Sequence, residues 1–420
     1  MGADMKRNTG RRAAPGEKAG RKKQKNKREQ RKDKENEMKI TLKKSLFLEK
    51  LQPAMGTVSN KNTITSIEGV LIETLPNGRI QISTYDMNKG VRATLDAVSI
   101  EREGKYIINA QRLYQTVRVM PEDEITIEIN DKLNCTIYSG KASFSLYAMN
   151  GADFPNFPEL VTDRGFTISP ALLRKMIGKV IHSVSDQDSR PMLCGAYFEI
   201  SDDMLEVVSC DSYTLSRCTY KCELGKFGAK DDKLSFIIPG AALLEIMKIF
   251  PDDDEKTVKV YLSRKHAIVS GEDIIFFTRM IDSEYIDYNR VIPKDNDVSV
   301  TVDRESFLGS LERANIIAEE KIQGSGRSYV KLSIEGQFFD ITSASVNGKV
   351  YEELDCVHEG PDLKIGFNCR YLINSVKAAE GENIHITMKG PTQAMLIEPC
   401  ERDERFDYLY MILPVRMNEG

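Results

Sequence analysis

The 420-residue chain lacks the features of a membrane or exported protein. No stretch approaches the roughly 18 apolar residues of a membrane-spanning helix, and no apolar secretion segment opens the chain. The eight cysteines are scattered, which is typical of cytoplasmic thiols and not of a disulfide framework. Cys218 and Cys222 form a lone C-x3-C pair with no second pair to complete a zinc site. We therefore predict a cytoplasmic protein with structural cysteines and no metal.

Catalytic groupings are missing as well. The sequence has no glycine-rich loop that would hold a phosphate and no cluster of metal ligands. Its four histidines are dispersed, and none lies beside a serine or cysteine in a recognised catalytic motif. We predict that the protein is not an enzyme and that it uses no cofactor.

What the chain does have is a long internal repeat. A strand that runs into a helix occurs three times, with a threonine in each strand. Thr41, Thr167 and Thr301 lie 126 and 134 positions apart (167−41 and 301−167). A second strand-to-helix segment recurs at similar intervals, at 106–113, 236–243 and 365–372. A repeat of this length is a duplicated domain and not a solenoid unit of about 20–50 residues.

Each repeat also contains short runs in which apolar and polar residues alternate, as in half-buried strands. Each is therefore expected to be an α+β unit of two helices and two small antiparallel sheets. We predict three such domains, at 38–162, 163–294 and 295–420. The expected helices are 45–55, 109–119, 169–181, 239–249, 303–316 and 368–379.

The first 37 residues differ in composition from the rest. They hold eight Lys and six Arg against six Asp and Glu, a net charge of about +8, and no aromatic residue. Such a segment cannot bury a core, so we predict that residues 1–37 form a disordered basic arm. Three interpretations of it stay open: an arm that attracts nucleic acid, a dispensable solvated tail, or a mis-assigned start with the true one at Met38.

Charge is also unevenly divided within the remaining body. Residues 38–420 carry about −12 (−4 minus +8), yet the six expected helices hold eleven basic and five acidic residues, a net of +6. If the helices line one surface, that surface attracts phosphates by a salt-dependent force that ignores base sequence. No zinc finger, helix-turn-helix or aromatic stacking platform is present to read bases. The alternative is that Lys and Arg are simply good helix formers on solvated faces.

Several short motifs carry a family resemblance. They are Ser139-Gly140-Lys141 with Phe144-Ser145-Leu146, Ala152-Asp153-Phe154-Pro155, Asp287-Tyr288 with Arg290-Val291-Ile292-Pro293-Lys294, Ile365-Gly366-Phe367-Asn368, and the tail Tyr410-Met411-Ile412-Leu413-Pro414-Val415-Arg416-Met417. In their order and spacing, from Met38 to Met417, the chain resembles the bacterial DNA polymerase III beta subunit, the replicative sliding clamp.

The resemblance implies the DNA clamp fold, in which this chain would be half of a closed ring. Two copies would form a head-to-tail homodimer around duplex DNA, with helices inside and sheets outside, binding without sequence specificity. The protein would be a processivity factor of the replicative DNA polymerase, with a clamp-loader ATPase and other clamp-binding proteins as further partners. A second class of function stays open, a divergent clamp-like peptide-binding adaptor for a repair or mobile-element system.

The resemblance also assigns site residues. A basic loop contact falls at Lys61 and a polar contact at Gln187. Together with the helix cations, the predicted DNA-binding residues are Lys50, Lys61, Arg112, Arg118, Arg174, Lys175, Lys179, Gln187, Lys248, Arg313, Arg370 and Lys377.

The apolar part of the dimer interface maps to Phe144 and Leu146 in the first domain and to Ile316 and Ile317 in the third. Alternation of Phe144 and Leu146 suits an edge strand. These residues could equally belong to an ordinary core.

A pocket that would take a short partner peptide maps between the second and third domains. Its predicted residues are Arg190, Leu193, Cys210, Ser212, Tyr213, Thr214, Leu215, Ile286, Val291, Tyr371, Thr392, Ala394, Met411, Ile412, Leu413, Pro414, Val415 and Arg416. Apolar walls with a few polar rims suit peptide anchors, and Met adapts to varied side chains. The alternative for 411–413 is a plain buried strand. Departures from the family pattern at Pro191, Ser212-Tyr213-Thr214 and Ile286 bear on which peptides bind.

Overall fold

The computed structural model describes residues 37–59, 65–162, 164–201, 203–221, 233–319, 329–401 and 403–417. The basic arm before residue 37, the predicted DNA contact Lys61 and the cysteine Cys222 lie outside these ranges. The chain divides into a first unit, Met1–Phe157, and a second unit, Pro158–Gly420, which are described separately below.

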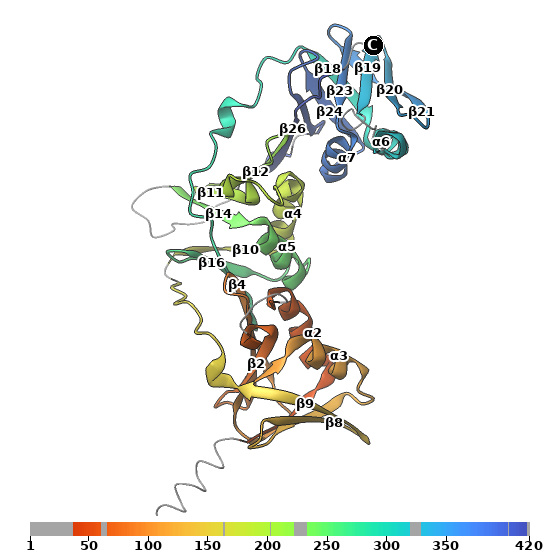
Figure 1. Ribbon diagram of the computed structural model, residues 1–420. Helices are drawn as coiled ribbons and strands as arrows, with labels where there is room; N and C mark the ends of the chain where they lie inside the picture. The colour runs from red at the N-terminus through yellow and green to blue at the C-terminus, as the bar shows by residue number, and fades with distance from the viewer. Residues whose placement is uncertain are drawn as a thin grey trace, which may run out of the picture. The chain divides into compact units, whose positions relative to one another are not determined.

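Six α-helices lie in the described residues, each within two residues of the predicted bounds (Figure 1). They are α2 (Lys44–Ala54), α3 (Ala110–Val119), α4 (Pro170–Val180), α5 (Gly240–Ile249), α6 (Arg304–Ala318) and α7 (Cys369–Ala378). Four of them begin at a residue whose side chain accepts a hydrogen bond from a backbone amide of the first turn, which satisfies a donor that the helix leaves free. These N-cap residues are Asn109, Ser169, Asp303 and Asn368. No described helix is long and apolar enough to cross a bilayer.

The strands of the first unit are antiparallel and lie in the order β4-β3-β2-β6-β9-β8-β7-β1-β5. Their bounds are β1 (Met38–Lys43), β2 (Gly69–Thr74), β3 (Arg79–Tyr85), β4 (Lys89–Asp96), β5 (Ser99–Arg102), β6 (Lys105–Asn109), β7 (Glu124–Ile129), β8 (Asn134–Ser139) and β9 (Ala142–Asn150). Strand β9 links two halves of the unit, because 142–147 pair with β8 and 148–150 pair with β6. Helix α2 packs against α3 and against β1, β3 and β4.

The strands of the second unit form three groups, β10-β15-β16-β17, β14-β11-β12-β13-β26-β25-β24-β18-β22 and β21-β20-β19-β23. In the second repeat the bounds are β10 (Gly165–Ile168), β11 (Gly195–Ser201), β12 (Met204–Cys210), β13 (Thr214–Lys221), β14 (Lys233–Pro239), β15 (Val258–Leu262), β16 (His266–Ser270) and β17 (Ile274–Arg279). In the third they are β18 (Val298–Asp303), β19 (Val330–Glu335), β20 (Phe338–Ala344), β21 (Lys349–Asp355), β22 (Val357–Glu359), β23 (Leu363–Phe367), β24 (Asn383–Met388), β25 (Met395–Pro399) and β26 (Phe406–Ile412).

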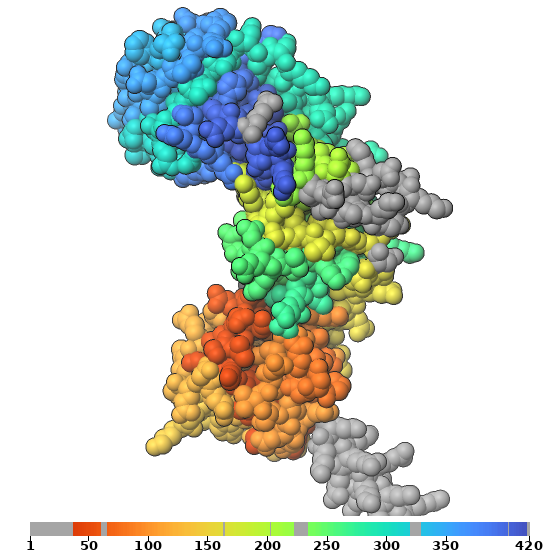
Figure 2. Space-filling view, turned by 180° about the vertical axis from the view of Figure 1, so that it is seen from behind, coloured from red at the N-terminus to blue at the C-terminus, as the bar shows by residue number. Residues whose placement is uncertain are grey.

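The predicted α+β architecture is confirmed, with one addition. The small sheets of the second and third repeats are joined, because β13 pairs with β26 along seven residues from Thr214↔Ile412 to Tyr220↔Phe406. In the space-filling view the dark blue C-terminal part lies against the yellow-green part of the second repeat (Figure 2). This junction places side chains of two repeats on one continuous surface.

Helices cover one face of each sheet, and strand alternation shows which face. In β12, the Ser209 hydroxyl donates to the carbonyl of Val180 at the end of α4. In β3, the equivalent Thr84 hydroxyl donates to the carbonyl of Ala54 at the end of α2. Because successive side chains of a strand point to opposite faces, the neighbours of these residues point away from the helices.

Candidate functional site

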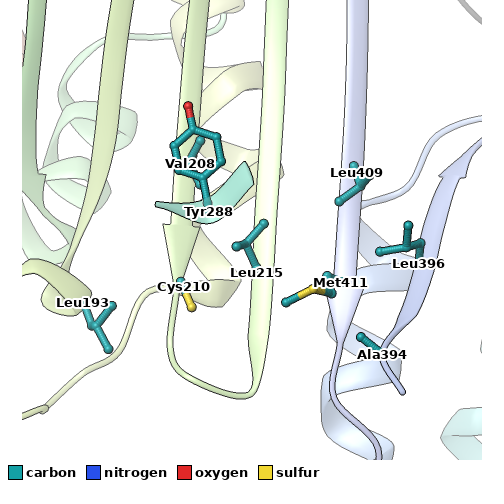
Figure 3. Close-up of a cluster of buried hydrophobic side chains, with 9 residues drawn as sticks. All are labelled: Leu193, Val208, Cys210, Leu215, Tyr288, Ala394, Leu396, Leu409 and Met411. Atoms are coloured by element: carbon teal, nitrogen blue, oxygen red, sulfur yellow. The ribbon is translucent and has the colours of Figure 1, made fainter. Parts of the chain in front are cut away.

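A buried apolar cluster lies on the helix-free face of the sheet where the second and third repeats join. Figure 3 shows its nine side chains, which come from strands and connecting segments of both repeats. The cluster consists of Leu193, Val208, Cys210, Leu215, Tyr288, Ala394, Leu396, Leu409 and Met411. Leu215 of β13 lies directly opposite Met411 of β26 in the strand pairing. The cluster therefore exists only because the two repeats share a sheet.

The segment that connects the second repeat to the third forms one wall of this cluster. The ring of Tyr285 stacks on Tyr197 of β11 at 5.0 Å between centroids, and Ile286 and Ile292 pack against the cluster. The Tyr288 hydroxyl donates a hydrogen bond to the buried Glu206 carboxylate. Burial, together with this carboxylate, raises the pKa of Tyr288, so the phenol keeps its proton and continues to donate.

The rim of the pocket is polar and is fixed by short-range hydrogen bonds. Asp211 accepts from the amides of Tyr213 and Thr214 at 2.9 and 2.6 Å, which closes the turn between β12 and β13. Arg190 makes two bonds to Asp188, at 3.1 and 3.2 Å, and donates to the Ser212 hydroxyl.

An aromatic pair stands at the same rim. Tyr213 is 58% exposed, and its ring stacks on Tyr371 of α7 at 5.8 Å. One ring of this stacked pair comes from each repeat. At the position of Tyr213, the family pattern has a different residue.

Most of the predicted apolar pocket residues are brought together. Leu193, Cys210, Leu215, Ala394 and Met411 belong to the cluster, with Ile286 packed against it. Others lie around the rim or the chain end: Arg190, Ser212, Tyr213, Val291, Tyr371, Thr392, Leu413, Pro414, Val415 and Arg416 are exposed or half-buried.

Two predicted pocket residues face the other way. Thr214 and Ile412 lie opposite each other on β13 and β26 and point to the helix side. The Thr214 hydroxyl donates to Ser183 at 2.9 Å in a buried polar group beneath α4. Neither side chain belongs to the apolar cluster, because each neighbours a residue that does face it.

The same alternation identifies what the sequence prediction missed. Val208, Leu396 and Leu409 each stand two positions from a predicted pocket residue on the same strand or its approach. A period-two rule applied to Cys210, Ala394 and Met411 would have found all three. The alternation rule does not apply to Tyr288, Tyr285, Met192 and Ile292, because they reach the cluster from segments that are not strands, and Tyr197 lies on β11, where no pocket residue was predicted.

The helix cations form the second candidate site, and most are paired with acids. Ion pairs of 2.5–3.0 Å, each with at least one exposed partner, join Lys50 to Glu49, Lys175 to Glu380, Lys248 to Glu245, Arg313 to Glu352, Arg370 to Glu319 and Lys377 to Glu312. Within the described residues Arg112 and Arg118 of α3 are exposed with no ion pair, and Arg174 donates to the Phe250 carbonyl at 3.2 Å. Gln187 is exposed beside α4.

Lys179 does not belong to an accessible surface. It is 5% exposed, donates to the Ala378 carbonyl at the end of α7, and pairs with Glu380 at 2.9 Å. Its ammonium lies 4.6 Å from the centre of the Tyr408 ring. Lys179 ties α4 to the third repeat, so we leave it out of the candidate DNA surface.

Among the free strand edges of the described residues, two carry or lie beside the predicted interface residues. The 142–147 part of β9 pairs only with β8, and Phe144 on it is 43% exposed. Strand β21 pairs only with β20. Near β21, Ile316 is 72% exposed and Ile317 is half-buried, so neither pair of predicted interface residues is an ordinary core.

These features define a class: a triplicated α+β protein whose helices cover one face of its sheets, and whose second and third repeats share a buried apolar cluster on the other face. The chain matches the sequence models of the DNA polymerase III beta subunit for its N-terminal domain at 38–158, central domain at 167–287 and C-terminal domain at 289–416. The chain therefore belongs to the DNA polymerase III beta subunit family.

Individual relatives agree over nearly the whole chain. The beta sliding clamp of Bacillus subtilis is 27% identical over 390 residues, which is 90% of this chain and 100% of the relative. That of Streptococcus pneumoniae serotype 4 is 29% identical over 393 residues, 90% and 99% respectively. Among solved structures, a putative DNA polymerase III beta subunit from Eubacterium rectale superposes with a TM-score of 0.83 at 26% identity, covering 90% of this chain and 100% of that one. The Bacillus subtilis sliding clamp gives 0.83 at 27% identity, covering 90% and 99%.

Proposed function

We propose that this chain is the sliding clamp of a replicative DNA polymerase, acting as a ring of two copies around duplex DNA. The observation that carries the proposal is the division of each sheet into two faces, one covered by cation-bearing helices and one free of them. A ring with helices inside would present Lys and Arg to phosphates and keep the acidic remainder outside. Backbone contacts without base contacts permit sliding.

The ion pairs on the helices are compatible with this role. Exposed pairs contribute only about 0–1 kcal/mol each, so a phosphate can replace a carboxylate at low cost. Weak, exchangeable contacts suit a clamp that must move along DNA. The proposed contacts are Lys50, Arg112, Arg118, Arg174, Lys175, Gln187, Lys248, Arg313, Arg370 and Lys377, with Lys61 from outside the described ranges.

Ring closure would use the two open edges. A head-to-tail dimer places the β9 edge of one copy against the β21 edge of the other, which satisfies both rows of backbone groups. Phe144 and Leu146 would then pack against Ile316 and Ile317 of the second copy. Such a ring needs a separate clamp-loader ATPase to open it, and we propose no catalysis by the clamp itself.

The apolar pocket would dock the polymerase and other partners through a short peptide. Each Leu or Phe anchor that becomes buried there contributes about 1.5–3 kcal/mol. The described cysteines are all free thiols, which fits the proposed cytoplasmic location. The adaptor alternative has no support from the relatives, all of which are clamps.

The test is retention on closed circular against linear DNA after loading. A ring held by topology stays on circles and slides off free ends. Equal retention on both would refute encirclement, while leaving the peptide pocket untouched.

A further inference from the structure

The first unit has a cleft of its own on the helix-free face of its sheet. Its volume is about 690 Å³, which lies within the roughly 300–1,000 Å³ of small-ligand sites. Strands β2, β3, β4 and β6 form the floor, through residues such as Leu71, Gln81 and Arg92, and the segment 150–157 forms the wall. We refer to this as the first-unit cleft.

The first-unit cleft corresponds by internal repeat to the face that holds the partner pocket. In the second repeat, Asp211 closes the β12–β13 turn, and the following Ser212 has a φ of 79°. In the first, Asp86 accepts from the amides of Asn88 and Lys89 in the same way, and the following Met87 has a φ of 76°. The two turns match residue for residue, which aligns the strands on either side of them.

The segments that cross the two faces also match. Asp153-Phe154-Pro155-Asn156-Phe157 and Glu284-Tyr285-Ile286-Asp287-Tyr288 share one pattern, an acid, an aromatic, an apolar residue, an Asx and an aromatic. Both segments lay two aromatic rings on the sheet, with Phe154 and Phe157 5.5 Å apart in the first unit. At Gly151 a Cβ would come within 2.6 Å of the Lys105 carbonyl, so glycine lets this segment approach β6 closely.

An arginine occupies the same position on this face in both repeats. Arg92 stands opposite Ser83, as Arg217 stands opposite Val208 in the second repeat. The Arg92 guanidinium lies 4.1 Å above the centre of the Phe157 ring, which fixes its plane.

Arg92 has no carboxylate partner among the described residues. Its Nε is buried without a hydrogen-bond acceptor, and the nearby Glu73 is engaged by Lys105 at 3.1 Å. Burial lowers the pKa of Arg92, and the negative charge of Glu73 raises it by less. The Arg92 guanidinium therefore loses more to desolvation than it gains from its one acidic neighbour. A carboxylate in the cleft would balance the guanidinium charge, which has no carboxylate partner, beside apolar walls from Leu71 and Phe154.

We propose that the first-unit cleft binds a short peptide segment in which an acidic residue stands next to an apolar or aromatic one. The carboxylate pairs with the stacked Arg92 guanidinium, and the apolar side chain covers Phe154 and Leu71. This is a second peptide site, separate from the partner pocket, and it does not depend on ring closure.

The test uses the full chain and the probe acetyl-Asp-(4-fluoro-Phe)-amide, followed by fluorine NMR line broadening. The wild-type protein is expected to broaden the probe signal, and the amide analogue acetyl-Asn-(4-fluoro-Phe)-amide is expected to bind about tenfold more weakly, as loss of a charge-assisted bond requires. Arg92→Gln is expected to remove the difference between the two probes. Arg92→Lys keeps the positive charge but lacks the planar guanidinium that stacks on Phe157. It should therefore keep part of the difference in affinity between the two probes.

Arg79→Gln is the matched control, because Arg79 lies on the neighbouring β3 and pairs with Asp96 instead of lining the cleft. It should leave binding unchanged, and circular dichroism should show that all variants are folded. The proposal is overturned if folded Arg92→Gln still prefers the acidic probe. It is equally overturned if Met411→Ala, in the partner pocket, removes the binding that Arg92→Gln leaves intact.

Discussion

The two exposed arginines of α3 give the sharpest test of the helix face. Arg112 and Arg118 have no ion pair in the described part of the chain, whereas Arg313 is bound by Glu352 at 2.7 Å. An unpaired cation is free to displace counterions from DNA in full. Each phosphate contact contributes about 0.9 to the slope of log K against log salt concentration.

The double substitution Arg112→Gln with Arg118→Gln should therefore lower that slope by about 1.8 for each copy in contact with DNA. Over a fourfold rise in salt, from about 50 to 200 mM, the wild type should lose about twelvefold more affinity than the variant. Fluorescence anisotropy on a labelled linear duplex measures both proteins across the salt series. Since both side chains are exposed, the thermal midpoint should stay unchanged.

The matched control is Arg313→Gln with Glu352→Gln, which removes one ion pair and leaves the net charge as it was. Its slope of log K against log salt concentration should change by less than half as much as that of the α3 variant. If the α3 variant binds with the wild-type slope, α3 does not face DNA. If the slopes of both variants fall by the same amount, the reasoning from unpaired charge is incorrect.

Other measurements test the remaining sites. Deleting residues 413–417 should abolish binding of a partner peptide and leave the dimer intact on sizing; retained binding would exclude the pocket. Phe144→Asp should place a charge on the open β9 edge and convert dimer to monomer in analytical ultracentrifugation, and an unchanged dimer would exclude that edge. Burial and the neighbouring Lys179 lower the pKa of His182 from 6.5 to about 4, so the unfolded chain takes up the proton first as pH falls. The contribution of His182 to the free energy of unfolding should thus be fully present above pH 6.5 and should fall by roughly 3 kcal/mol down to pH 4. Urea titrations measure this change, and His182→Gln should flatten the dependence on pH.

The helices were predictable because their signals are local. Capping residues such as Asn109, Ser169 and Asp303 mark the starts, and the apolar spacing that follows marks the buried side. The joined sheet was not predictable from the repeat, because the β13–β26 pairing is a contact between residues almost 200 positions apart.

The pocket shows where residue-by-residue transfer from a family fails. It named Leu215 and Met411, which share the buried cluster, and also their neighbours Thr214 and Ile412, which point to the opposite face. Lys179 was named as a DNA contact for a different reason. Its burial depends on the end of α7 and on Glu380, and nothing in the sequence of α4 indicates either contact. Period-two alternation corrects the first kind of error and only a structure corrects the second.

The free edges of β9 and β21 allow open-ended assembly as well as ring closure. A subunit with a free edge at β9 in its first unit and at β21 in its second can pair with a single sister molecule or with a succession of them. Pairing with a succession of molecules yields fibres. The hydrogen bonds along the strands are the same in a fibre and in a closed dimer, so they do not discriminate between these assemblies. Substitutions that bend the subunit without weakening either edge would therefore be expected to produce filaments instead of monomers.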